Sequence, residues 1–262
     1  MPTQSSPTSA IEKACRVLTA LTDPRNATLA RIAAVTGIHK VSVLRVLQTL
    51  VQEKLVEKVP HSHEYRYGLA MYAISAALQS RLSITTAAAA GMRRLAERSG
   101  DTVLLVVRSG MECICVARET GNYPIHASTL HIGSRRPLGV GSGPLAVLAW
   151  LGEAERETAL EHLAAQARIY PNFTVDKVRR LVAETQDSGC AVVYDSVLSQ
   201  IGGIGMAILD AQGEPVGAIS ISTLSSRLRE REELLRTLLA REVSAVSREL
   251  AQGAVTPGSH RP

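Results

Sequence analysis

The feature that most restricts the fold of this chain is a short helix, a glycine turn and a longer helix in its first quarter. Residues 28–35 (TLARIAAV) predict a short helix capped by Thr28, and Thr36-Gly37-Ile38 predicts a tight turn. The segment HKVSVLRVLQTLVQEK then predicts a longer helix. This layout allows the second helix to enter the major groove of DNA.

The longer helix has a predicted apolar face and a predicted polar face. On a helical wheel the expected buried face is centred on Leu44, Leu47 and Val51, with Val43 and Leu50 beside them. The opposite face carries His39, Ser42, Arg45, Val46 and Thr49.

Two strand-like segments follow this helix. LVEKV and EYRYGL are separated by PHSH, a spacing typical of a β-hairpin. A hairpin directly after the second helix distinguishes a winged helix-turn-helix. A small helical subdomain with a hairpin that binds nothing fits the same pattern, so the pattern alone leaves both interpretations open.

Positive charge is concentrated in the same part of the chain. Residues 1–67 contain 9 Lys and Arg against 5 Asp and Glu, out of totals of 29 and 24. Nearly all of the net charge of +5 therefore lies where a phosphate-binding module needs it. An excess of this size also occurs in ordinary domains.

Polar and basic side chains of the longer helix and the hairpin are the candidates for contacts with double-stranded DNA: His39, Lys40, Ser42, Arg45, Thr49 and Arg66. The basic side chains and His39 offer contacts to phosphates, and the hydroxyls can reach base edges. Arg45 is best suited to bidentate pairing with guanine. Each residue alone also fits a solvated helix face.

The rest of the chain predicts an α+β fold with a largely antiparallel sheet, similar to a GAF or PAS domain and suited to a ligand pocket. Strands are expected at TVLLVVRS, CICVARE, CAVVYD, GGIGMAILD and GAISISTL, with strand and loop at TGNYPIHASTLHIGS and a long helix over 226–251. The predicted domains are a winged helix-turn-helix (10–68), a linker helix (69–83), a second domain (84–251) and disordered tails (1–9 and 252–262).

Two features of the second domain are candidates for ligand binding. Three glycines in the loop 139–150 precede an apolar helix, where the N–H groups of Ser142 and Gly143 can attract a carboxylate. The same loop also fits a tight turn with close helix packing. Ser220 and Ser222 place two hydroxyls on one face of a strand, where they line a pocket or face solvent.

Several other classes are disfavoured. The chain contains no GxSxG or HExxH motif and no Cys/His cluster with zinc spacing, so we predict no enzyme, no cofactor and no metal site. No apolar stretch predicts a membrane span, and the polar start MPTQSSPTSA has no signal-peptide pattern, which predicts a cytoplasmic protein. The cysteines lack framework spacing and are expected to be free and buried: Cys15, Cys113, Cys115 and Cys190.

The order of these segments resembles the IclR family of bacterial transcriptional regulators. The resemblance is carried by IEKACRVLTAL, LARIAAVTGIHKVSVLRVLQTLVQEKLVEK, YRYGLAMYAIS, IGSRRPLGVGSGPLAVLA, DSGCAVVYD and ILDAQGEPVGAISIS, over roughly residues 10–250. It implies a homodimer or tetramer that binds a palindromic operator and senses small organic acids or aromatic metabolites. It also implies a recognition helix at 39–50 and an effector site that includes Ser142, Gly143, Asp195, Ile201, Gly203, Ser220 and Ser222.

The sequence departs from the family pattern at several of these positions. Lys40-Val41-Ser42 stands where Lys-Ser-Thr is common, Asp195 alone remains of an acidic run, and Gly203 replaces a cysteine. Pro144-Leu145 replaces a Gly-Lys pair. These changes predict a more open, less acidic pocket with a different effector or none. The alternatives to an effector-controlled regulator are a metabolic enzyme with a winged helix for dimerisation, and a ligand-independent architectural protein.

Overall fold

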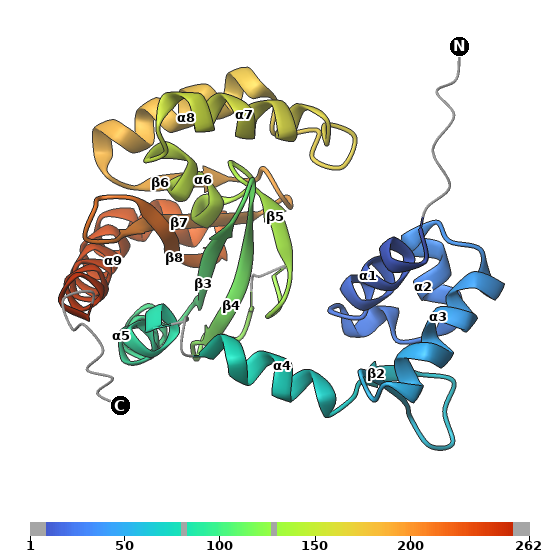
Figure 1. Cartoon of the computed structure of the whole chain (residues 1–262). Coiled ribbons are helices and arrows are strands. Elements are labelled where there is room, and N and C mark those ends of the chain that lie inside the picture. The colour runs from blue at the N-terminus through green and yellow to red at the C-terminus, as the bar shows by residue number, and fades with distance from the viewer. Residues whose placement is uncertain (1–8, 80–82, 127–129, 254–262) are drawn as a thin grey trace, which may run out of the picture. The chain divides into compact units, whose positions relative to one another are not determined.

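The computed structural model describes residues 9–79, 83–126 and 130–253. Contacts divide the chain into two compact units, residues 1–82 and 83–262 (Figure 1). Most of each predicted disordered tail, and the end of the predicted linker helix, lie outside the described residues.

The first unit contains the predicted winged helix-turn-helix. Its elements are α1 (Ala10–Ala20), a 3-10 turn (Pro24–Asn26), α2 (Leu29–Thr36), α3 (Lys40–Gln52), β1 (Val56–Lys58), β2 (Tyr65–Tyr67) and α4 (Ala70–Gln79). Thr28 caps α2 by accepting a hydrogen bond from the N–H of Arg31. Gly37 adopts a φ of 68°, the left-handed conformation that lets the chain turn tightly into α3. The turn and the hairpin predicted from the sequence are therefore confirmed.

The buried face of α3 is rotated from the predicted one. Val43, Leu47 and Leu50 pack into the core of this unit, but Leu44 and Val51 are 36% and 37% exposed. The apolar residues of α3 cover more than one stripe, and packing against α1 and α2 decides which stripe is buried.

The helical spacing of α1 predicts one apolar stripe, formed by Ile11, Ala14, Cys15, Leu18 and Leu21. This prediction is partly wrong, because Ile11 and Cys15 are exposed, whereas Val17, outside the stripe, is fully buried. Cys15 therefore corrects the expectation that all four cysteines are buried, which holds for the other three.

The second unit is built on one antiparallel sheet with the strand order β5-β4-β3-β8-β7-β6. Its strands are β3 (Thr102–Ser109), β4 (Glu112–Thr120), β5 (Arg135–Pro137), β6 (Ala191–Tyr194), β7 (Ile201–Leu209) and β8 (Pro215–Leu224). The predicted antiparallel α+β architecture is confirmed. The expected strand in 120–134 is absent from the described part of that segment, except for Thr120 at the end of β4.

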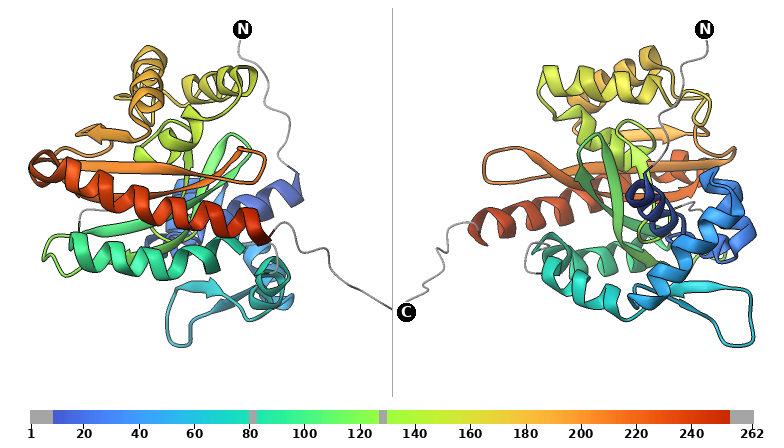
Figure 2. Two further views of the ribbon diagram at one scale, coloured as in Figure 1. Left: turned by 90° about the vertical axis from the view of Figure 1, so that its left-hand side faces the viewer. Right: turned by 45° about the vertical axis from the view of Figure 1, so that its right-hand side comes forward.

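Helices cover both faces of the sheet. They are α5 (Ser83–Ser99), α6 (Ser142–Ala149), α7 (Glu153–Ala164), α8 (Val175–Ser188) and α9 (Ser225–Gly253). Figure 2 shows α5 and α9 side by side along one face. The other face carries α6, every residue of which is buried, with α7 and α8 outside it (Figure 1). This burial explains why α6 is apolar all round.

A buried carboxylate attaches α9 to the start of β3. Asp101, with a side chain 1% exposed, accepts hydrogen bonds from Thr223 Oγ1 at 2.7 Å and Arg227 Nε at 3.1 Å. Arg231 Nη1 contacts its second oxygen at 3.3 Å. Both arginines also donate to the carbonyl of Ser99.

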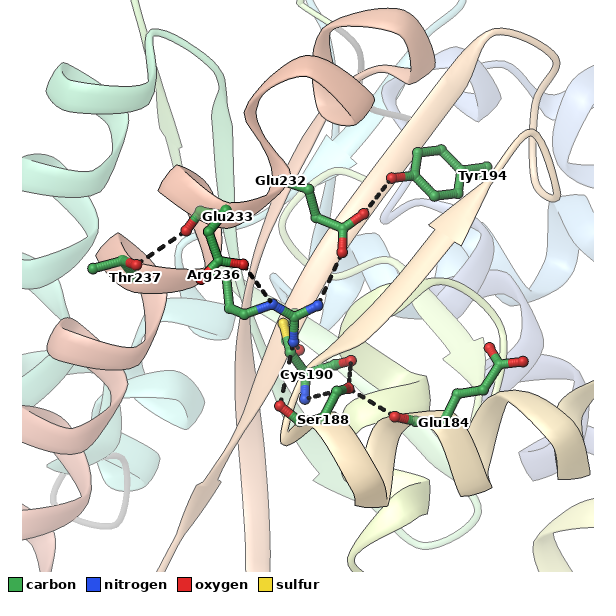
Figure 3. A network of polar contacts seen from close by, with 9 residues as sticks. Glu184, Ser188, Cys190, Tyr194, Glu232, Glu233, Arg236 and Thr237 are labelled. Carbon is green, nitrogen blue, oxygen red and sulfur yellow. Dashed lines mark hydrogen bonds and ion pairs between the residues drawn. The ribbon is translucent and has the colours of Figure 1, made fainter.

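A second polar network attaches β6 and α8 to α9 (Figure 3). Tyr194 Oη donates to Glu232 Oε2 at 2.6 Å, and Arg236 Nη2 donates to Glu232 Oε1 at 2.9 Å. Arg236 Nη1 also donates to the carbonyl of Ser188, at the end of α8, at 3.2 Å. The network thus joins segments that are far apart in sequence.

These contacts change the acidity of two groups. The hydrogen bond from Tyr194, together with Arg236, holds the pKa of Glu232 below its ordinary value, although burial opposes this. Burial, and then the contact with Glu232, raises the pKa of Tyr194 to about 12. A carboxylate with a lowered pKa stabilises the fold above its unfolded pKa and loses that contribution as the pH falls through its folded pKa. A tyrosine with a raised pKa loses its contribution as the pH rises through its folded pKa.

We expect Glu232→Gln to lower the free energy of unfolding at pH 7 by less than about 1 kcal/mol, because the Glu232 side chain is 34% exposed and solvent screens the pair. The difference from the wild type should shrink on acidification to a pH well below the ordinary pKa of a glutamate, because the contribution of the carboxylate is lost as the pH falls through its lowered folded pKa. Urea unfolding of both proteins at the two pH values measures it. An unchanged difference at both values would contradict the role assigned to Glu232.

Candidate DNA-binding surface and effector cavity

The DNA-binding candidates lie on α3 and on the hairpin formed by β1 and β2. Five of the six are exposed, and Ser42 is partly buried: His39, Lys40, Ser42, Arg45, Thr49 and Arg66. His39 is the N-cap residue of α3, with Nδ1 accepting from the N–H of Val41 at 3.4 Å. Thr49 Oγ1 donates to the carbonyl of Arg45 at 3.2 Å. A hydroxyl bonded to its own helix must rotate before it can donate to a base.

The hairpin is fixed to the helices of its unit. The N–H of Tyr65 donates to the carbonyl of Ala27 at 2.7 Å, and Tyr67 Oη donates to the carbonyl of Leu18 at 2.7 Å. Arg66 pairs across the hairpin with Glu57, and both side chains are largely exposed. An exposed pair of this kind contributes little stability, so Arg66 can exchange Glu57 for a phosphate at small cost.

A small cavity lies inside the second unit, where the start of α6 meets the sheet. Its volume is about 60 Å³, which accommodates a few water-sized groups in the form described. Its lining includes most of the predicted effector residues, namely Ser142, Gly143, Ile201, Gly203, Ser220 and Ser222.

The floor of the cavity follows from the register of two strands, β7 and β8. Ser220 and Ser222 of β8 lie opposite Gly205 and Gly203 of β7, respectively. Because alternate residues of a strand point to the same face, both hydroxyls and both glycines lie under α6. Because the two glycines have no side chains, α6 can pack directly against β7. A Cβ at Gly205 would lie 2.8 Å from the carbonyl oxygen of Ser142.

Gly203 has a specific structural consequence. A Cβ at this position would lie 2.6 Å from Ser142 Oγ, far inside van der Waals contact. The space of a side chain at 203 is therefore taken by the hydroxyl of Ser142. The sequence predicted a more open pocket from the glycine, and here Ser142 fills part of that opening.

Two buried hydroxyls face the cavity without using their hydrogen-bonding capacity. Ser142 and Ser220 are 8% and 4% exposed, and neither side-chain oxygen has a hydrogen-bond partner among the described residues. Gly141 precedes α6 and offers no side-chain cap to its first turn. Buried polar groups in folded proteins are normally satisfied, so unused groups around a cavity indicate a ligand or ordered water.

The structure places Asp195 elsewhere. Its carboxylate accepts from Ser225 Oγ at 2.8 Å and pairs with Arg229 at 3.4 Å, and it is not among the lining residues. These contacts, led by the hydrogen bond from Ser225, lower the pKa of Asp195. Asp195 thus connects the end of β6 to α9 and leaves the cavity without its expected carboxylate.

Sequence reasoning missed several lining residues. They are Leu104, Leu130, Arg136, Val140, Gly141, Pro144, Val193, Val197, Leu198 and Gly202. Most are apolar residues that resemble any core position in the sequence. Arg136 is the one charged residue among them, and no local signal distinguishes it from its neighbour Arg135. The two side chains differ only because successive residues of β5 point to opposite faces of the sheet.

Neither a metal site nor a membrane span is indicated by the described residues. Within them, no group of three or more His, Cys, Asp or Glu side chains is arranged to hold a metal ion. No helix of the described chain is both long and apolar enough to cross a membrane.

Comparison with solved structures shows the same fold in other proteins. An IclR homolog from Microbacterium hydrocarbonoxydans, crystallised with 4-hydroxybenzoate, is 20% identical, with a TM-score of 0.75 over 93% of this chain and 100% of that chain. An IclR transcriptional regulator from Alicyclobacillus acidocaldarius is 24% identical, with a TM-score of 0.74 over 91% and 97%.

Sequence comparison finds relatives that are transcriptional regulators rather than enzymes. The transcriptional regulator XynR of Escherichia coli is 24% identical over 77% of this chain and 80% of its own length. The repressor AllR of the same species is 28% identical over 72% and 70%. Residues 10–60 match the IclR helix-turn-helix domain, and residues 76–250 match the family described as bacterial transcriptional regulator IclR C-terminal. Because the second match alone spans more than half of the chain, this protein belongs to the IclR family of bacterial transcriptional regulators.

Proposed function

We propose that this regulator binds a palindromic operator through α3 of two copies of the chain, and that a small organic effector in the cavity controls this binding. The exposed polar face of α3, with Arg45 near its centre, is the observation that supports operator recognition. Arg45 is assigned to a base edge, and Lys40, His39 and Arg66 to phosphates. Because the target is chromosomal DNA, we also propose a cytoplasmic location.

Retention of promoter DNA tests this proposal directly. The purified protein should bind DNA from its own promoter region in preference to unrelated DNA at near-physiological salt. Equal retention of both kinds of DNA would exclude a sequence-specific regulator and favour an architectural protein.

Arg45→Ala is expected to weaken binding to the preferred DNA by about 1–3 kcal/mol, because a bidentate contact with a base would be lost. Binding to unrelated DNA should change much less. Titration with labelled DNA measures both affinities. Arg179→Ala is the matched control, since this arginine is 52% exposed on α8 in the other unit. If both variants bind the preferred DNA like the wild type, Arg45 does not read a base.

The exposed apolar face at the start of α4 supports a homodimer or tetramer. Leu69, Tyr72 and Ile74 are 87%, 68% and 52% exposed. Leu69 and Tyr72 are three residues apart in the sequence, a spacing that places them on the same side of the predicted linker helix, and within the described chain neither is covered. A second copy would remove this surface from water, which stabilises association. Sedimentation equilibrium of the full chain gives the oligomeric state.

The effector is proposed to be a small carboxylate or aromatic compound. The support is the pair of buried hydroxyls without partners, together with the uncapped start of α6, where N–H groups favour a negative group. The solved homolog with bound 4-hydroxybenzoate has the same fold and carries a ligand of this kind. Asp195 is left out of the proposed pocket, because its carboxylate is engaged by Ser225 and Arg229.

Control by the effector requires a difference in affinity. The effector must bind one arrangement of the paired DNA-binding units more tightly than the other, since equal affinity shifts no population. It can then repress or activate, according to which arrangement fits the operator. Operator titrations with and without an effector that stabilises the protein measure this coupling.

A further inference from the structure

The outward face of α3 differs from the polar face expected from the sequence. Ser42 and Val46, both expected on that face, are partly buried, whereas Val41 and Gln48 are exposed together with Arg45. Val41 lies one turn before Arg45, and residues four apart on a helix share a face, with Cβ atoms about 5–6 Å apart. The face that α3 presents to solvent therefore carries an aliphatic side chain beside the arginine assigned to a base edge.

Val41 is the most exposed apolar residue of α3. It is 53% exposed, against 36% for Leu44 and 37% for Val51. A residue exposed to this extent adds little to the core of its unit, and a β-branched residue is a poorer helix former than alanine. The fold of the unit does not require valine at this position, and its apolar surface is available to another molecule.

The place of Val41 in the helix indicates which molecule this is. His39 caps α3 by accepting from the N–H of Val41, so Val41 belongs to the first turn. In helix-turn-helix proteins the first residues of the second helix contact base edges. Lys40 precedes Val41, and Arg45 shares its face. A second copy meeting this face about a twofold axis would bring the same cations together, whereas DNA supplies the opposite charge.

Thymine is the base that offers an aliphatic side chain a matching group. Its C5-methyl lies in the major groove, where the edges of the other bases present hydrogen-bond donors and acceptors. An aliphatic side chain placed against one of those groups removes water without replacing its hydrogen bond. Successive bases of a strand are about 3.4 Å apart along the DNA axis, so Val41 and Arg45 can reach neighbouring base pairs.

We infer that Val41 is a specificity-determining residue of the DNA-binding surface and selects a thymine, through its C5-methyl, about one or two base pairs from the guanine read by Arg45. The inference rests on the proposed operator function and adds a base that the polar candidates do not select. Val41 stands where a serine is common in the family, so this thymine contact is a property of this chain.

Thymine and uracil copies of the same promoter DNA test the inference on the full-length protein. Uracil keeps the base pairing and the O4 acceptor of thymine and lacks only the methyl. Titration gives the dissociation constants of both copies for the wild type, V41S, V41T and V51S. V51S is the matched control, since Val51 is also an exposed valine of α3 but lies near its other end. Thermal unfolding of each variant shows that the fold is intact.

The wild type should bind the uracil copy about 15-fold more weakly than the thymine copy. Each buried methyl is worth about fourfold in affinity, and two copies of the chain contact one operator. V41S should reduce this thymine preference by at least about fourfold, because a hydroxymethyl group replaces the aliphatic side chain. V41T should keep part of the preference through its remaining methyl. V51S should behave like the wild type.

Three results would overturn the inference. Equal binding of both copies to the wild type would show that no thymine methyl is read. A thymine preference that folded V41S keeps in full would assign the methyl contact to another residue. Equal losses of the preference in V41S and V51S would show that it does not depend on a contact at position 41.

The proposed operator function is tested separately by the thymine copy. If the wild type retains this copy in preference to unrelated DNA, the operator function stands whatever the uracil copy shows. If the wild type has no such preference, the operator function and the thymine contact are both refuted, since the contact requires sequence-specific binding.

Discussion

Replacing Asp101 by alanine is expected to lower the free energy of unfolding of the second unit by about 3–5 kcal/mol. The carboxylate is 1% exposed and is the shared partner of Arg227, Arg231 and Thr223. Its removal leaves two arginines, 25% and 21% exposed, close together without the negative charge that holds them. The partial exposure of both arginines places the effect nearer the lower end of this range.

Urea unfolding at neutral pH measures this effect. The matched control is Glu157→Ala, because Glu157 also pairs with an arginine in the same unit but is 49% exposed. An exposed pair is worth at most about 1 kcal/mol, so the control should change stability little. Comparable losses in the two variants would mean that burial of Asp101 adds nothing to its contacts.

Leu47→Ala is expected to lower the stability of the first unit by about 2–5 kcal/mol and to abolish operator binding. Leu47 is fully buried between α3 and the helices that support it, so truncation leaves a cavity in a small core. A unit of this size has little stability to spare. Unfolding of α3 would then remove the DNA-binding surface without any change in the residues that contact DNA.

Leu44→Ala is the control for this prediction. Leu44 is 36% exposed on the same helix, although the sequence pattern placed it at the centre of the buried face. Its truncation should cost less than about 1 kcal/mol, because little apolar area returns to water. Denaturant unfolding monitored by circular dichroism, together with DNA titration, distinguishes the two variants. Equal losses at positions 44 and 47 would restore the face predicted from the sequence and contradict the packing of α3.

The local elements of the DNA-binding unit were predictable because their signals are local. Thr28 at the start of α2 and Gly37 at its end determine a helix and a turn from the conformational preferences of single residues. The face of each helix that is buried was less predictable. Exposed Ile11 and buried Val17 show that a wide apolar stripe leaves several orientations open until the neighbouring helices are in place.

The candidate cavity was predictable only in part. The spacing of Ser220 and Ser222 placed both hydroxyls on one face, and the glycine loop indicated the start of a helix. The resemblance to a family predicted that the serine pair and the glycine loop belong to one site. The register of β7 and β8 explains why these two features lie together. The same resemblance predicted Asp195 as part of the site. In the structure its carboxylate is instead engaged by Ser225 and Arg229.

The short helix, the glycine turn and the longer helix of the first unit could be predicted from the sequence, because propensity, capping and turn chemistry act between residues close in the chain. Packing between distant segments determines which face of α3 is buried and which of two adjacent arginines lines the cavity. Arg135 and Arg136 have the same chemistry, and only the pairing of β5 with β4 turns one outward and one toward α6. Contacts between distant segments make that choice, so no local pattern carries it.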